Sequence, residues 1–190
     1  MKLSYPVAVM LSRIAAGRAE DIGVPMVIAL SDGQGELIHF SRMDDALPAS
    51  RTIAVNKAYT AAALRMATHE VGQLAQPGEP LYGIQHTMEG RAVLFGGGYP
   101  LRIGNCVAGA LGISGGTVDQ DMDVGQTVLV AWGKMLDVAG ALTPIVPDEV
   151  ASYPKGRKLL LEALTIAISQ GASAFPADSE IILAGALWLV

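Results

Sequence analysis

The sequence is poor in charged and aromatic residues. Of its 190 residues, 16% are charged and 5% are aromatic, whereas 51% are hydrophobic. Soluble domains contain about 25% charged residues, so this chain has little polar surface with which to cover a monomer. We therefore expect apolar area to be buried between the subunits of a homo-oligomer. The core of a domain of this size must consist mainly of Ala, Val, Leu and Ile.

Several features that mark particular partners or compartments are also scarce. The net charge is -5, and no Lys/Arg cluster offsets it, so we expect no nucleic-acid partner. The longest apolar run, Ile181 to Val190, is about half the length needed to cross a bilayer, so no membrane span is expected. Cys106 is the only cysteine and is expected to be a small buried hydrophobe. Arg13 and Arg18 interrupt the first apolar stretch, where a signal peptide would be continuous, so a cytoplasmic location is expected.

Hydrophobic spacing predicts an α+β domain with an antiparallel sheet. The expected helices are 4–23, 51–67 with Ser50 as N-cap, 68–74, and a last one that Thr117 and Gln120 begin as a capping box and that runs to about 138. The expected strands are 25–30, 36–42, 92–95, 101–103 and 106–113. The sheet would therefore have five strands.

The segment 112–116 reads Gly-Ile-Ser-Gly-Gly, which has the G-x-S-x-G pattern of a hydrolase nucleophile elbow. That fold needs a histidine after the serine, and all three histidines of the chain precede Ser114. We therefore reject a serine hydrolase. Gly115 and Gly116 either form a simple turn or present backbone N–H groups at a helix N-terminus, where a carboxylate or phosphate would bind.

Lys57 falls on the apolar stripe of its predicted helix, together with Ile53, Ala61 and Leu64. A lysine in that position needs a partner for its charge. Its stem can extend along the helix to the surface, or its ammonium can be held near Asp44 or Asp45, or it can face the carboxylate of a ligand in a pocket.

The three histidines, His39, His69 and His86, do not have the spacing of metal ligands. Each occurs alone, on a predicted strand, in a short helix and in a loop, respectively. We expect no zinc or iron–sulfur site.

A series of short segments carries a resemblance to a known family. They are Val24 to Val27, Arg42 to Ala46, Ala54 to Ala61, Pro77-Gly78, Leu81 to Gly83, Phe95 to Leu101 and Gly109 to Asp121. In order and spacing, over about residues 1–138, they resemble the GlcG/HbpS-like family, whose fold is that of the C-terminal domain of PduO. The G-G-x-P-L and G-x-S-G-G-T-x-x-Q-D blocks, after a K-A-Y-T-A helix, are the most specific.

The resemblance implies a profilin-like or PAS-like domain over residues 1–140 with a five-stranded antiparallel sheet, assembled as dimers, tetramers or octamers. Residues 141–190 would be a C-terminal extension, a helix and an apolar tail, that packs on the domain or on an interface. The implied site lies at one end of the sheet. Its residues are Lys57, Asp44, Gly97, Gly98, Pro100, Gly115, Gly116, Thr117 and Asp121.

The resemblance also implies a function: binding of haem, a related tetrapyrrole or another planar cofactor, as an accessory to a catabolic pathway. His39, His69 and His86 are then the candidate haem ligands. Two alternatives stay open. The protein is an enzyme that acts on a small carboxylate or carbonyl metabolite with Lys57 as the catalytic candidate, or it is an assembly or chaperone-like partner of a catabolic enzyme.

Overall fold

The computed structural model describes residues 2–142. The chain divides into two compact units, Met1–Leu129 and Val130–Val190. The first unit contains all of the site residues predicted above. The predicted extension, 141–190, lies outside the described residues except for its first two, which end a helix.

The elements alternate between helices and pairs of strands. In chain order they are α1 (Tyr5–Asp21), β1 (Val27–Asp32), β2 (Leu37–Arg42), α2 (Ser50–Ala63), α3 (Thr68–Leu74), the 3-10 turns η1 (Ile84–His86) and η2 (Met88–Gly90), β3 (Gly98–Ile103), β4 (Cys106–Ser114) and α4 (Val118–Leu142). The four strands form one antiparallel sheet in the order β2-β1-β4-β3. The predicted α+β class is confirmed.

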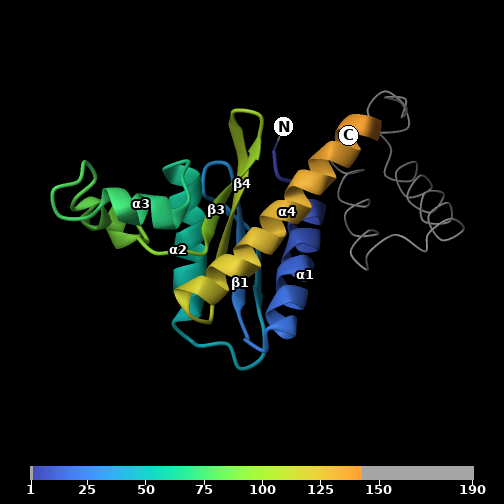
Figure 1. Cartoon of the computed structure of the whole chain (residues 1–190), viewed down its shortest axis with the longest axis horizontal. Coiled ribbons are helices and arrows are strands. Elements are labelled where there is room, and N and C mark those ends of the chain that lie inside the picture. The colour runs from blue at the N-terminus through green and yellow to red at the C-terminus, as the bar shows by residue number, and fades with distance from the viewer. Residues whose placement is uncertain (1, 143–190) are drawn as a thin grey trace, which may run out of the picture. The chain divides into compact units, whose positions relative to one another are not determined.

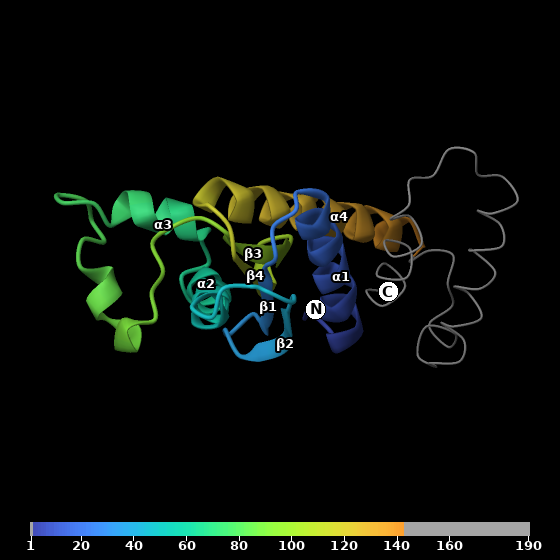
Figure 2. The same cartoon turned by 90° about the horizontal axis from the view of Figure 1, so that it is seen from below.

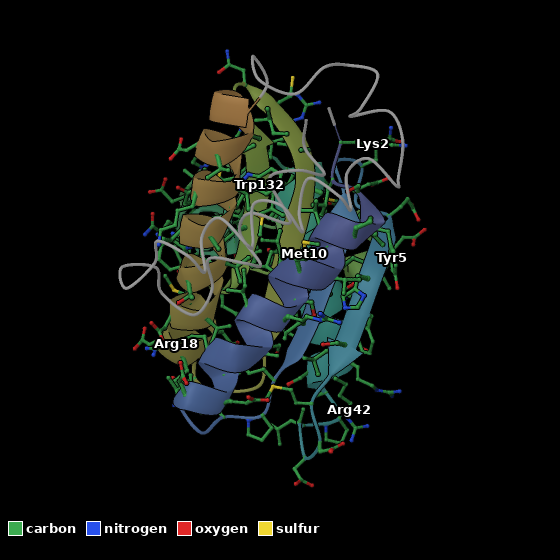
Figure 3. The ribbon with its side chains drawn as sticks, turned by 90° about the vertical axis from the view of Figure 1, so that its right-hand side faces the viewer. Lys2, Tyr5, Met10, Arg18, Arg42 and Trp132 are labelled. Carbon is green, nitrogen blue, oxygen red and sulfur yellow. The ribbon has the colours of Figure 1, made fainter. Side chains whose placement is uncertain are left out.

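Helices cover both faces of the sheet (Figures 1 and 2). On one face, Val27 and Ala29 of β1 pack against Ala54 and Ala58 of α2. Neighbouring side chains of a strand point to opposite faces, so the buried Ile28 and its alternate neighbours point to the other face, where α1 and the first half of α4 lie (Figure 3). β1 is thus buried on both faces, which explains its continuous apolar run.

The alanine-rich composition of α2 allows this helix to approach β4 closely. A Cβ atom at Gly112 would collide with the backbone carbonyl of Ala54 and would lie 2.6 Å from the backbone nitrogen of Ala58. Larger side chains on either element would separate the helix from the sheet. The pattern of small residues therefore reflects helix-to-sheet packing.

The prediction of five strands is wrong, because residues 92–95 do not form a strand. The backbone of this segment packs against helices instead. The N–H group of Val93 donates to Oγ1 of Thr60 in α2 at 3.0 Å. The carbonyl of Leu94 lies directly against Gly72 in α3. An apolar tetrapeptide between glycine-rich segments has the composition of a strand, but here the N–H group of Val93 is bound to α2 rather than to a neighbouring strand.

Two helix starts test the capping predictions. Ser50 is not an N-cap: it is buried in the first turn of α2, and Ala49 occupies the cap position without a side-chain bond. The capping box of α4 is confirmed, because Thr117 N–H donates to Gln120 Oε1 at 2.9 Å and Gln120 N–H donates to Thr117 Oγ1 at 3.3 Å.

Two further features differ from the sequence predictions. α2 ends at Ala63 rather than near residue 67, and Arg65 adopts a left-handed conformation with φ 53°. Cys106 is exposed rather than buried, since it follows the turn that joins β3 to β4. Within residues 2–142, no helix has both the length and the hydropathy required to cross a membrane.

Candidate functional site

Lys57 is fully buried at the centre of the first unit, with an exposed fraction of 0%. Its Nζ atom donates to the carbonyl oxygen of Ile113 in β4 at 2.7 Å and to Oδ2 of Asp121 in α4 at 2.6 Å. The ring of Phe95 covers the ammonium, with its centroid 4.9 Å from Nζ. The stem of Lys57 therefore does not extend to the surface.

The carboxylate that pairs with Lys57 belongs to Asp121 and not to Asp44 or Asp45, the partners suggested by the sequence. Both of those residues are exposed, in the loop that precedes α2. The second oxygen of Asp121, Oδ1, accepts the N–H groups of Gly115 and Gly116, each at 3.1 Å. The glycine turn at the start of α4 thus binds a carboxylate, and that carboxylate belongs to the protein itself.

The pKa values of Lys57 and Asp121 are altered by burial and by the charge of the partner group. Burial lowers the pKa of Lys57, and the Asp121 carboxylate opposes that change. Burial likewise raises the pKa of Asp121, while Lys57 and the two glycine N–H groups oppose the rise. Both charges are therefore desolvated, and their mutual hydrogen bonds compensate for lost water. An ammonium held in this way is not accessible to a substrate carbonyl.

Gly97 makes this close packing possible. Its φ of +103° is one that other residues rarely adopt. A Cβ atom there would lie 2.8 Å from Nζ of Lys57 and 2.9 Å from Cβ of Asp121. The two predicted glycine turns therefore do meet at Lys57. The structure brings together five of the predicted residues, namely Lys57, Gly97, Gly115, Gly116 and Asp121.

The remaining four predicted residues, Gly98, Thr117, Asp44 and Pro100, are not part of this cluster. The N–H group of Gly98 donates to Oγ1 of Thr68 at 3.0 Å, which fixes the start of β3 to the start of α3. Thr117 caps α4. Asp44 is exposed and belongs to neither glycine turn. Pro100 lines a separate, open pocket.

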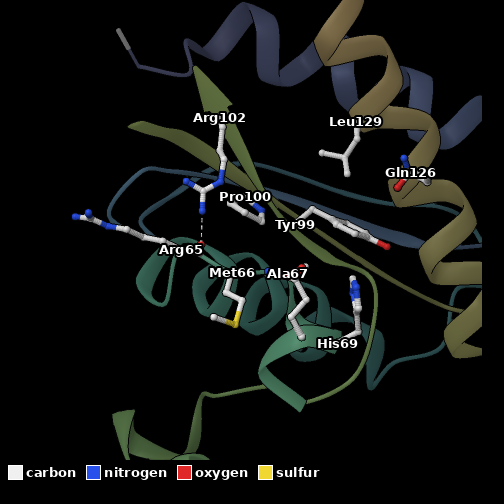
Figure 4. A pocket seen from close by; sticks show the side chains of 10 residues that line it. Arg65, Met66, Ala67, His69, Tyr99, Pro100, Arg102, Gln126 and Leu129 are labelled. Atoms are coloured by element: carbon white, nitrogen blue, oxygen red, sulfur yellow. Dashed lines mark hydrogen bonds between the residues drawn. The ribbon is translucent and has the colours of Figure 1, made fainter. Parts of the chain in front are cut away.

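That pocket has a volume of about 410 Å³ and lies between the junction of α2 and α3, strand β3 and helix α4 (Figure 4). Its lining combines apolar side chains with polar and charged ones. The lining residues are Arg65, Met66, Ala67, His69, Glu70, Tyr99, Pro100, Arg102, Gln126 and Leu129.

His69 and Tyr99 provide polar groups on the side of the pocket nearest α4 (Figure 4). Their ring centroids are 5.9 Å apart. The Nδ1 atom of His69 is buried and has no hydrogen-bond partner among the described residues. Burial, with a contribution from Glu70, raises the pKa of Tyr99.

Arg102 and Glu70, two charged residues of the lining, each hydrogen-bond a backbone group. A guanidinium N–H group of Arg102 donates to the backbone carbonyl of Arg65. Oε2 of Glu70 accepts the N–H group of Ala67, so this carboxylate caps α3. The side chain of Arg65 points away from the pocket in Figure 4.

The other two histidines lie elsewhere. The ring of His39, on β2, makes an edge contact with Tyr5, and burial lowers its pKa. His86 is exposed at the end of η1. Residues 2–142 contain no cluster of three or more His, Cys, Asp or Glu side chains that could hold a metal ion.

Comparison with known proteins identifies the family of this chain. The model of the family described as haem degrading protein HbpS-like matches residues 3–129. The chain belongs to the HbpS-like family. The matched residues coincide with the first compact unit, so the Lys57 cluster and the open pocket both lie within the HbpS-like domain.

Two relatives contain a region similar to this domain in chains of different length. The corrinoid adenosyltransferase PduO of Citrobacter freundii is 46% identical over 131 residues, which cover 69% of this chain but 39% of PduO. An uncharacterised 15.0 kDa protein from the dhaT-dhaS intergenic region of the same organism is 42% identical over 125 residues, which cover 66% of this chain and 88% of that protein. The HbpS-like domain is therefore a part of PduO and nearly the whole of the smaller protein.

Solved structures have the same fold. Protein ORFY of Klebsiella pneumoniae is 36% identical, with a TM-score of 0.67 over 70% of this chain and 92% of that chain. The structure of a PduOC:haem complex is 43% identical, with a TM-score of 0.66 over 68% of this chain and 94% of that chain.

Sequence reasoning missed most of the residues around the pocket of this HbpS-like domain. Tyr99 was noted as part of a motif, whereas Arg65, Met66, Arg102 and Gln126 were not singled out. One signal was present: Arg102 is a charged residue within a short apolar strand, which indicates a side chain at the sheet edge. The other lining residues come from separate elements that only the fold brings together.

Proposed function

We propose that this HbpS-like chain binds haem, or another planar tetrapyrrole, as a small-molecule-binding accessory to a catabolic pathway. One observation carries the proposal: the PduOC domain that was solved in complex with haem is 43% identical to this chain over 94% of its own length. At that level of identity, conserved ligand chemistry is a reasonable inference, although fold alone would not support it.

The open pocket has residue types that suit a tetrapyrrole. Met66, Pro100 and Leu129 provide apolar surface for a macrocycle. His69 provides an imidazole, whose Nδ1 atom lacks a partner, and imidazole is a common axial ligand of haem iron. Bound haem would supply an iron centre whose absorption reports its ligands. Among the three histidines, only His69 lines this pocket.

The Lys57 cluster, in this proposal, supports the site and does not react. Lys57 and Asp121 join α2, β4 and α4, and the adjoining Gly97 and Gly98 lead directly into Tyr99 of the pocket wall. A catalytic role for Lys57 through a Schiff base would require an accessible amine, and this amine is enclosed by Ile113, Asp121 and Phe95. We therefore favour binding over catalysis at Lys57.

The test is an optical titration of the purified full chain with hemin. We expect a saturable shift of the Soret band in the wild type. His69→Ala should abolish or displace that shift, whereas His39→Ala and His86→Ala, which alter histidines outside the pocket, should leave it unchanged. If the wild type shows no saturable Soret shift, the haem proposal is wrong. If His69→Ala binds hemin with an unchanged spectrum, the iron is held elsewhere.

A further inference from the structure

We propose that Tyr99 is a positioning residue for His69 in the open pocket. In this arrangement Nδ1–H of His69 donates a hydrogen bond to the phenol oxygen of Tyr99, and the lone pair of Nε2 is left for the ligand. The inference rests on the proposed function, because it concerns the same histidine. It goes further, because it names the residue that fixes the tautomer and the direction of that histidine.

His69 has one ring nitrogen that is enclosed by the protein. Its Nδ1 atom is buried and makes no hydrogen bond with the described residues. A buried polar atom without a partner costs about 1–3 kcal/mol, so each such atom needs an explanation. Histidines that hold a metal bind it through one nitrogen and almost always donate the N–H of the other to a neighbouring group. For His69, the enclosed Nδ1 is the nitrogen that such a neighbour would hold.

Tyr99 is the neighbour whose position fits this role. The centroids of the two rings are 5.9 Å apart, with the rings inclined by 59°, and the imidazole of His69 is directed toward the Tyr99 ring (Figure 4). Tyr99 is 5% exposed, and its hydroxyl forms no hydrogen bond within residues 2–142. A phenol oxygen can accept one hydrogen bond while it donates another. Both residues thus have an unused polar group at the same end of the pocket.

Helix α4 holds the Tyr99 ring in place. A Cβ atom at Gly125 would collide with Cε2 of that ring and would lie 2.8 Å from its Cδ2. The glycine therefore lets the ring rest directly on the backbone of the helix. The phenol is fixed by this packing, whereas an imidazole can turn about its second side-chain torsion at little cost. We expect the imidazole to turn toward a phenol that does not move.

The chemistry of Tyr99 suits a positioning role better than direct binding of iron. Iron is bound by the phenolate form of tyrosine. Burial and the carboxylate of Glu70 raise the pKa of Tyr99, which favours the neutral phenol. Two other polar groups of the lining have different tasks. Oε2 of Glu70 accepts the N–H group of Ala67, and Arg102 is only a donor, so it cannot accept a hydrogen bond from Nδ1–H.

The first experiment observes the imidazole of His69 directly. Long-range ¹H–¹⁵N spectra of the purified full chain, recorded at about pH 8.5, where an ordinary imidazole is neutral, report which ring nitrogen carries the proton. His69→Ala assigns the signals. Tyr99→Phe removes the hydroxyl and keeps the ring, and Tyr82→Phe does the same at an exposed tyrosine outside the pocket lining. We expect the proton on Nδ1 in the wild type and in Tyr82→Phe, and a loss of that preference in Tyr99→Phe.

A second pair of variants displaces the phenol without removing it. Gly125→Ala places a methyl group against the Tyr99 ring, whereas Gly133→Ala, on the same helix, places one where nothing lies within 4 Å. We expect Gly125→Ala to change the His69 signals as Tyr99→Phe does, and Gly133→Ala to leave them unchanged. Circular dichroism checks that each variant is folded. If Gly125→Ala does not fold, Tyr99→Phe, which retains the ring contacts, decides the question alone.

The second experiment measures what this hydrogen bond does for the ligand. Hemin is titrated into the same variants, and binding is followed by the Soret band. Loss of a group that orients a metal-binding histidine weakens binding by about tenfold to a hundredfold. We expect a loss in that range for Tyr99→Phe, together with a displaced Soret band. Tyr82→Phe and Gly133→Ala should bind hemin as the wild type does.

The outcomes separate this inference from the haem proposal. If hemin binds the wild type and Tyr99→Phe with the same affinity and spectrum, the inference is wrong while haem binding stands. If the His69 signals of the wild type and Tyr99→Phe are the same, the inference is also wrong, because Tyr99 does not then act through His69. If hemin fails to bind but the tautomer of His69 depends on Tyr99, the haem proposal is wrong and Tyr99 positions His69 for another ligand.

Discussion

Lys57 and Asp121, 64 positions apart in the sequence, form a buried ion pair with Nζ and Oδ2 separated by 2.6 Å. Their side chains are 0% and 4% exposed. The pair joins α2 to α4 beside the end of β4, and the N–H groups of Gly115 and Gly116 also bind the carboxylate. It is the point at which the predicted motifs converge.

Removing the carboxylate of this pair should destabilise the fold strongly. Asp121→Ala leaves a buried ammonium with a single carbonyl acceptor, and we expect a loss of about 3–5 kcal/mol in the free energy of unfolding. Asp123→Ala, two positions along the same helix, breaks the exposed pair with Arg18 and should cost less than about 1 kcal/mol. Urea denaturation of both variants measures the difference. Equal losses would show that Asp121 does not stabilise the fold as described.

A methyl group at Gly97 should be far less tolerable than one at Gly104. Both glycines have positive φ, 103° and 56°, so alanine carries a backbone cost of about 1–2 kcal/mol at either position. At Gly104 nothing lies near the added atom, whereas at Gly97 it would meet Ile113, Lys57 and Asp121. We expect thermal unfolding to show a distinctly larger loss for Gly97→Ala. A smaller loss there than at Gly104 would contradict the packing described.

The amine of Lys57 should resist chemical modification in the folded protein. It is enclosed on all the sides that its contacts define, whereas Lys2 is exposed near the N-terminus. Brief acetylation followed by peptide mass spectrometry should show Lys2 modified and Lys57 unmodified. In urea both should react. Rapid acetylation of Lys57 in the native state would reopen a nucleophilic role for it.

His39 should make stability depend on pH in the mildly acidic range. Burial lowers its pKa in the folded state below the usual 6.5, so the unfolded state takes up the proton first as the pH falls. Stability is therefore complete above about pH 6.5 and declines below it. The wild type should lose more of its melting temperature than His39→Gln between about pH 7.5 and about pH 5.5. Equal losses would mean that His39 titrates as it does in water.

The sequence analysis predicted the order of the four helices and of the four observed strands, the capping box of α4 and the convergence of the two glycine turns on Lys57. These features depend on local spacing and on motif resemblance, which a sequence carries directly. The partner of Lys57 was not predicted, because Asp121 lies in another element and its register against α2 depends on the whole sheet. Residues 92–95 were mistaken for a strand, because their composition does not reveal that Thr60 and Gly72 lie beside them.

The open pocket was the least predictable feature. His69 and Pro100 had been named, but their neighbours come from the end of α2, from β3 and from α4. No local pattern connects residues that meet only after the chain has folded. The cytoplasmic location, the homo-oligomeric state and the role of the extension 141–190 stay predictions.

The edge strand β3 limits how copies of this domain can associate through their sheets. In β3, Pro100 has no N–H group and the N–H group of Gly98 is bound to Thr68, so another strand cannot pair there. Among the described strands, β2 is then the edge where pairing can occur. If β2 of one copy pairs with β2 of another, neither copy has a second edge among its described strands that can pair. Edge-to-edge growth through the described strands would then stop at two copies, so we expect a finite assembly rather than an open fibre.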